Sequence, residues 1–151
     1  MRGTGILATV FMLAACGGGS QQPATMDEMP ADSVAFAAEQ FDAAVYDTLT
    51  WEGDTAAVSR GRVVYAFSCR KCHGGTGLGD AGFVLRGDTL RPPSLVAPDW
   101  KFANDLPGLR LQVFTGNLDG MPHWGLVGLK AREIDAVTKY IVEELRAAPA
   151  K

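Results

Sequence analysis

Apolar residues recur at helical spacing in four stretches of this 151-residue chain. In residues 32–49 they fall at intervals of three and four, which predicts a short amphipathic helix with Asp32 or Ser33 as its N-cap. Its apolar face is expected either to pack on the domain that follows or to bind a partner. A second helix is predicted over residues 55–68, with Asp54 as its cap.

Two further helices are predicted in the second half of the chain. Asp105 and Pro107 have the order of an N-cap and a first-turn proline, and Gly116 is expected to end that helix just after Thr115. Residues 130–146 show the clearest amphipathic pattern, with one apolar face made by Ile134, Val137, Tyr140, Ile141 and Leu145. No stretch has a convincing strand pattern, so the fold is expected to be all-α.

The N-terminus has the composition of an export signal followed by a linker. Residues 1–15 contain one basic residue, an apolar stretch and small residues before Cys16, which is typical of a signal peptide. The stretch is shorter than the roughly 20 apolar residues that a membrane-spanning helix needs. Leu13-Ala14-Ala15-Cys16 resembles the lipobox of bacterial lipoproteins, in which the signal is removed and the cysteine is acylated. An ordinary signal peptide with an incidental cysteine is the alternative.

Composition divides the rest of the chain into three parts. Residues 16–31 are predicted to be a flexible, lipidated tether, because they begin with a Gly/Ser-type stretch. Residues 32–53 form an acidic, helical extension. Residues 54–148 are expected to be one domain, since they contain no internal repeat. A domain of this size has a small core, and a bound prosthetic group would add apolar interior.

Charge is distributed unevenly along the chain. From Cys16 to Asp54 there are eight acidic residues and no Lys or Arg, whereas residues 55–151 contain thirteen basic and nine acidic residues. The acidic segment is either a solvated linker or a competitor for a basic face that steers an acidic partner. Candidates for that basic face are Arg70, Lys71, Arg86 and Lys101.

Cys69-Arg70-Lys71-Cys72-His73 is the motif that carries the chemistry. Cys-x-x-Cys-His is the attachment signature of haem c: two thiols bind the vinyl groups of one porphyrin, and the histidine ligates the iron. The motif occurs once, so one covalent haem is expected. A redox dithiol is the first alternative, but it belongs at the start of a helix near a βαβ unit. A structural zinc site is the second, but it normally needs four Cys or His ligands.

The sixth ligand of the iron follows by elimination. Of the five methionines, only Met121 lies inside the predicted domain, and it stands between Gly120 and Pro122. A Met/His pair gives a high potential that suits electron transfer. His123, the only other histidine, is the competing ligand and would give bis-His coordination. An open sixth site is the remaining alternative.

A glycine-rich stretch follows the haem motif. Residues 77–82 match the dinucleotide fingerprint Gly-x-Gly-x-x-Gly, but the strand and βαβ unit that the fingerprint requires are missing. We therefore expect a loop around the edge of the haem. Arg91-Pro92-Pro93 is predicted to be extended, because a residue before proline avoids the α region.

From about residue 61 to residue 145, the chain resembles the class I c-type cytochromes of bacteria. Gly61 and Tyr65 resemble the glycine and aromatic residue of that family's first helix, on which the last helix crosses with its own aromatic, here Tyr140. Lys130 departs from the pattern, because the last helix usually opens with a capping side chain. Frayed residues are therefore expected at its start.

The resemblance also implies roles for residues around the haem. Pro93-Ser94-Leu95 resembles the Pro-x-Leu whose proline carbonyl accepts the proton of the haem histidine. The stretch from Gly120 to Trp124 resembles the axial-methionine loop. Trp100 resembles tryptophans that donate to a haem propionate, although plain core packing explains it equally well.

These features predict a lipid-anchored, monohaem cytochrome c on the periplasmic face of a bacterial membrane. It would carry single electrons between redox proteins, without catalysing bond chemistry and without binding nucleic acid. One alternative is a fixed cytochrome c subunit of a larger respiratory complex. The other is a haem enzyme or gas sensor with an open iron site.

Overall fold

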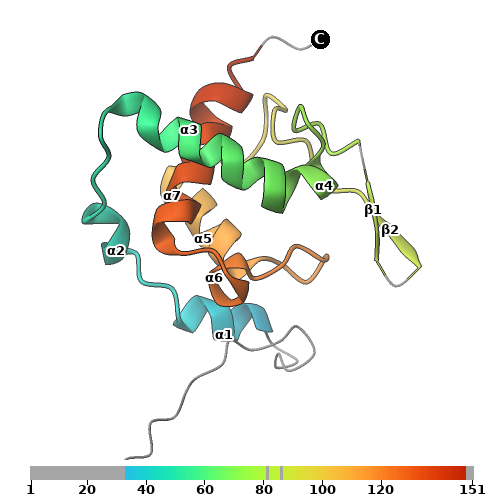
Figure 1. Cartoon of the computed structure of the whole chain (residues 1–151). Helices are drawn as coiled ribbons and strands as arrows, with labels where there is room; N and C mark the ends of the chain where they lie inside the picture. Colours follow the sequence, from blue (N-terminus) through green and yellow to red (C-terminus); the bar gives the residue numbers. More distant parts are fainter. Residues whose placement is uncertain (1–32, 81, 86, 149–151) are drawn as a thin grey trace, which may run out of the picture.

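The computed structural model describes residues 33–80, 82–85 and 87–148, and the predicted signal peptide and tether lie outside them. The described part is mostly helical, in agreement with the expected class (Figure 1). Its helices are α1 (Ser33–Glu39), α2 (Ala44–Asp47), α3 (Asp54–Val64), α4 (Arg70–His73), α5 (Leu106–Thr115), α6 (Trp124–Val127) and α7 (Ala131–Tyr140). Two π-helical turns, η1 (Tyr65–Cys69) and η2 (Ile141–Leu145), continue α3 and α7.

The crossing of α3 and α7 is the most extensive contact between two elements, and Figure 1 shows the two helices lying across each other. Gly61 makes it possible, because a Cβ atom there would lie 2.0 Å from the carbonyl oxygen of Ala136 and 2.6 Å from Cβ of Tyr140. Beside this point the rings of Tyr65 and Tyr140 pack with centroids 5.4 Å apart. The resemblance-based expectation of a glycine crossing with two aromatics is confirmed.

The start of α7 is held without a capping side chain at Lys130. The Lys130 N–H donates to the Glu133 carboxylate at 3.2 Å, and Arg60 of α3 pairs with the same carboxylate at 2.5 Å. These hydrogen bonds lower the pKa of Glu133, the backbone N–H of Lys130 having the largest effect. The start that was expected to fray therefore has a cap from its own first turn, the Glu133 carboxylate, and Arg60 of the crossing helix pairs with that carboxylate.

Residues 83–85 and 87–90 belong to a two-stranded antiparallel hairpin that the sequence did not reveal. Strands β1 (Phe83–Leu85) and β2 (Asp88–Leu90) pair with Phe83 opposite Leu90, and Gly87 in the turn has a φ of +94°. Each strand has only three residues, which is too short to show an alternating pattern. The hairpin projects from the side of the helical body (Figure 1) and leaves the class unchanged.

The acidic extension folds into two short helices where one was expected. After α1 the chain breaks at residues 40–43 and re-enters a helix in α2, with Asp42 accepting a hydrogen bond from the Ala44 N–H at 2.9 Å. The second predicted cap was also wrong: α3 starts at Asp54, and Gly53, with a φ of +101°, occupies the N-cap position. Asp54 is therefore the first residue of the helix and not the residue that caps it.

Aromatic side chains fix the extension, residues 33–53, to the domain. Helix α1 contacts α5 and α2 contacts α7. The Phe41 ring packs edge-on against Phe114 at 5.3 Å, and the buried Tyr46 ring lies under the Arg110 guanidinium at 5.1 Å. Burial raises the pKa of the Tyr46 phenol to about 12. Of the two expected roles, packing on the following domain is therefore the one that the structure confirms.

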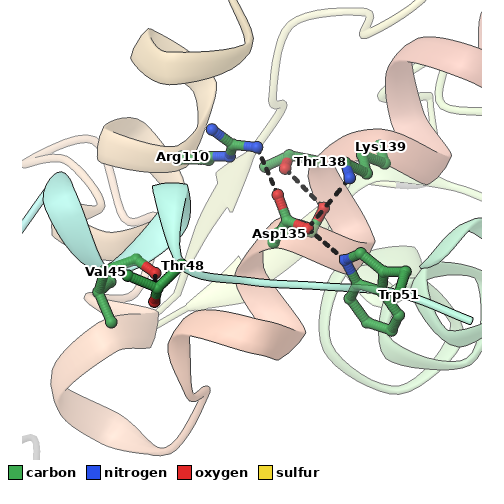
Figure 2. Close-up of polar contacts among 7 residues, drawn as sticks. All are labelled: Val45, Thr48, Trp51, Arg110, Asp135, Thr138 and Lys139. Carbon is green, nitrogen blue, oxygen red and sulfur yellow. Dashed lines mark hydrogen bonds and ion pairs between the residues drawn. The ribbon is translucent and has the colours of Figure 1, made fainter.

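A buried carboxylate ties the end of the extension to α5 and α7 (Figure 2). Asp135 is only 1% exposed and accepts a hydrogen bond from the indole N–H of Trp51 at 2.7 Å. Arg110 pairs with its other oxygen, and the Lys139 ammonium lies 3.4 Å away. Arg132 stacks on the Trp51 ring at 4.0 Å and donates to the Thr50 carbonyl. The extension thus supplies one of the hydrogen-bond donors to a buried carboxylate.

The idea that the acidic segment competes for the basic face near the haem motif stays a prediction, because Asp27, Glu28 and Asp32 lie outside the described residues of the extension. Its described part lies on α5 and α7, and no ion pair in the described residues joins it to Arg70, Lys71 or Lys101. Lys71 lies over the Phe83 ring and Lys101 over the Phe102 ring. Arg86 lies outside the described residues.

We expect Asp135→Asn to lower the free energy of unfolding by about 3 kcal/mol, because it leaves Arg110 and Lys139 without their buried counter-charge. Trp51→Phe keeps the ring and removes only the donor, so a loss of about 1–2 kcal/mol is expected. Urea denaturation of the haem-loaded protein, followed by circular dichroism, measures both. Glu52→Gln, at an exposed neighbouring acid, is the control and should change stability by less than about 0.5 kcal/mol. A Trp51→Phe variant as stable as the control would show that the extension is only a linker.

Candidate functional site

The predicted haem motif lies where η1 runs into α4. Cys69 is the last residue of η1, and Cys72 and His73 end the single turn of α4. The Tyr65 hydroxyl, one turn earlier, donates to the Gly74 carbonyl at 2.8 Å and closes the segment on itself. The two thiols are free, and they sit three residues apart on one helical turn, as attachment to one porphyrin requires.

The environment of the thiols argues against a redox dithiol. Burial raises the pKa of Cys69 to about 12, and the neighbouring Cys72 adds to this. The pKa of Cys72 is raised as well, mainly by burial, although Lys71 acts in the opposite direction. A reactive dithiol needs a lowered pKa, because the thiolate is the nucleophile. Their raised pKa values favour thiols that attach a haem over a reactive dithiol.

The imidazole of His73 is partly buried, and its Nδ1 has no hydrogen bond of standard geometry. Burial lowers the pKa of His73, and the nearby Pro93 carbonyl opposes this effect. The carbonyl therefore lies beside the ring, where the Pro-x-Leu resemblance places it. A neutral imidazole next to two attachment thiols fits a haem c whose iron the other ring nitrogen would bind.

The glycine-rich loop holds the Pro93 segment against the motif. Gly79 donates its N–H to the His73 carbonyl at 3.0 Å, and the Leu95 N–H donates to the Gly77 carbonyl at 2.8 Å. A Cβ atom at Gly79 would lie 2.1 Å from the Pro92 carbonyl oxygen. Gly79 thus allows two backbones to touch, and a Cβ atom at Gly77 would lie 2.9 Å from the Leu145 side chain. Residues 77–80 and 82 form a loop, as expected, and not a strand-to-helix turn.

Met121 lies on a loop that is closed by hydrogen bonds at its base. The Asn117 side chain accepts from the Met121 N–H at 3.0 Å, and the Asn117 N–H donates to the Met121 carbonyl at 3.1 Å. Gly116 has a φ of +65°, and a Cβ atom there would meet the Met121 carbonyl at 2.3 Å. The methionine side chain is partly buried and packs against the same apolar core as Cys69.

The His123 side chain contacts the end of α5. The side chain is 7% exposed, and its Nδ1 makes a short hydrogen bond with the Thr115 carbonyl. Trp124 follows as the first residue of α6 and packs, partly buried, against the core. His123 is thus hydrogen-bonded through Nδ1 to the last residue of α5.

Trp100 is buried, and its ring packs edge-on against Phe102 with centroids 5.6 Å apart. Arg146, just after η2, lies over the Trp100 ring at 5.3 Å and donates to the carbonyls of Leu95 and Ala97. Sequence reasoning missed Arg146, because one arginine in a charged C-terminal helix has no distinguishing signal. It joins the Pro93–Trp100 segment to the end of the last helix.

The zinc alternative has no ligand set in the described residues, where no three His, Cys, Asp or Glu side chains are grouped to hold a metal ion.

The chain matches the family described as "Cytochrome C oxidase, cbb3-type, subunit III" over residues 56–141, which is more than half of its length. Comparisons with curated proteins and with solved structures gave no significant match. The matched region contains the haem motif, Pro93 and Met121, but not the extension. On these grounds the chain belongs to the cbb3-type cytochrome c family, whose class I domain binds covalent haem c and transfers electrons through its iron.

Proposed function

We propose that this protein is a lipid-tethered, extracytoplasmic monohaem cytochrome c that carries single electrons between redox proteins. Cys69 and Cys72 would attach the haem, and His73 and Met121 would ligate its iron. Bound haem supplies the iron that cycles between ferric and ferrous states. The chain's own residues orient His73 through Pro93, hold Met121 on its loop, and exclude water with Trp100 and Trp124.

The observation that carries this proposal is the placement of Met121. Its backbone is fixed by Asn117, and its side chain packs against the same apolar core as Cys69. The hydrogen bond with the Thr115 carbonyl engages Nδ1 of His123 and leaves Nε2 as the nitrogen that the competing bis-His ligation would use. A thioether in the sixth position closes the iron to substrates, which favours electron transfer over an open-site enzyme or gas sensor.

A fixed subunit of a larger respiratory complex is the second candidate, and the family's description as an oxidase subunit favours it. Mild detergent extraction followed by a native gel separates the two. A shuttle migrates alone with its haem, whereas a subunit migrates with a larger haem-containing assembly.

Membrane attachment is proposed to depend on Cys16. No helix among the described residues has the length and apolar character of a membrane span. Domains of this family are typically extracytoplasmic. The lipobox-like residues 13–16 lie outside the described residues, so this part of the proposal rests on the sequence.

Covalent attachment predicts that haem survives denaturation. Protein made with the cytochrome c maturation system should retain haem peroxidase stain on a denaturing gel, and Cys69→Ala with Cys72→Ala should abolish it. Cys16→Ala, at the third cysteine, is the matched control and should keep the stain. Persistent stain in the double variant would refute the assignment.

Met121→Ala should lower the midpoint potential and leave the ferric iron either high-spin or bis-His, because the soft thioether that favours ferrous iron is lost. The weak near-infrared band of thioether-bound ferric haem should disappear. His123→Ala is the comparison variant and should keep both the band and the potential. The reverse result would make His123 the ligand.

Native protein should fractionate with membranes, and Cys16→Ala should either block lipoprotein processing or release a soluble form. Ser20→Ala, a similar change in the tether, should leave the distribution unaltered. If the Cys16→Ala protein is processed and still sediments with membranes, contacts with other proteins attach it to the membrane. That result would favour the fixed-subunit candidate over the lipid-tethered carrier.

A further inference from the structure

Gln112 on α5 is a half-buried polar side chain that faces the Met121 loop. Its Nε2 donates to the Gly116 carbonyl at 2.8 Å and lies 3.9 Å from Sδ of Met121, within hydrogen-bonding distance for sulfur. An amide nitrogen has two protons, so both contacts can be made at once. The family resemblance gave this glutamine no role, and the sequence does not distinguish it from a surface residue of the helix.

The orientation of the amide is set by its neighbours. A carbonyl oxygen and a thioether sulfur have no proton to donate, so the carbonyl end of Gln112 would face two acceptors if the amide were turned round. Only the amide nitrogen of Gln112 can donate hydrogen bonds to both acceptors. The glutamine is therefore a double donor to one loop, and it reaches the sulfur from the side of α5.

Other polar groups around the loop are engaged elsewhere. The Thr115 hydroxyl donates to the Leu111 carbonyl at 2.9 Å, and the His123 ring contacts the Thr115 carbonyl. Asn117 binds the backbone of Met121 and not its side chain. Within the described part of the chain, Gln112 is the only side chain that donates a hydrogen bond to Sδ.

We propose that Gln112 is a positioning residue for the Met121 thioether and raises the potential of the haem through it. This inference rests on the proposed role of Met121 as the sixth ligand. The amide proton occupies one lone pair of the sulfur and leaves the other for the iron, which fixes the orientation of the terminal methyl group. The same hydrogen bond withdraws electron density from the sulfur. A poorer donor stabilises ferric iron less, so the ferrous state is favoured.

The test compares Gln112→Leu with Gln40→Leu, the same substitution at an exposed glutamine that follows α1. A neutral hydrogen bond is worth about two- to tenfold in an equilibrium, which corresponds to about 20–60 mV for a one-electron couple. Gln112→Leu should lower the midpoint potential by that amount while the near-infrared band persists. The proton NMR signal of the bound methionine methyl should shift or broaden, because a second orientation becomes accessible. Gln40→Leu should change neither.

A double-mutant cycle separates a direct effect from a structural one. In a Met121→Ala background, Gln112→Leu should no longer change the potential, because the sulfur through which it acts is gone. An equal change with and without Met121 would overturn the proposal and make Gln112 a prop of the loop through Gly116. A potential and an NMR signal unaltered by Gln112→Leu alone would overturn it too. If Met121→Ala itself leaves the near-infrared band in place, the proposed ligand is wrong, which is a different failure.

Discussion

The close crossing of α3 and α7 is the constraint on which the rest of the structure depends. The two backbones can meet at Gly61 because glycine has no side chain; a Cβ atom there would clash with the Ala136 carbonyl. With the helices in contact, Tyr65 and Tyr140 meet, and Arg60 reaches the first turn of α7. The π-helical turn η1 continues α3 directly into Cys69. The crossing thereby sets the position of the haem motif relative to the last helix.

The loops around the motif are positioned from this helical frame. Arg146, at the end of η2, holds the carbonyls of Leu95 and Ala97 and so carries the position of the last helix into the Pro93 segment. At the proposed sixth ligand, Gln112 of α5 contacts Sδ of Met121. Both proposed ligands of the iron are thus supported by side chains from helices, which favours a fixed ligand geometry and a small reorganisation on electron transfer.

The extension is part of the fold although it lies outside the family match. Its aromatic residues Phe41, Tyr46 and Trp51 pack on α5 and α7. Trp51 also donates a hydrogen bond to the buried Asp135 carboxylate. A carboxylate removed from water needs all of its partners, since an unpaired buried charge costs several kcal/mol. The acidic residues Glu39, Asp42, Asp47 and Glu52 of the extension are each exposed.

The sequence by itself determined the cofactor and the longer helices. Cys-x-x-Cys-His and a single domain methionine identified the cofactor and its expected ligands, because those depend on residue type and local spacing. Long periodic segments such as residues 130–146 gave their helices for the same reason. Only the tertiary structure decided what the extension packs on, why α7 starts firmly at Lys130, and which side chains face Met121. Trp51 and Asp135 are 84 positions apart, and Arg60 and Glu133 are 73 apart, so no local pattern encodes their contact. Such pairs form only when the folded chain brings distant polar groups together.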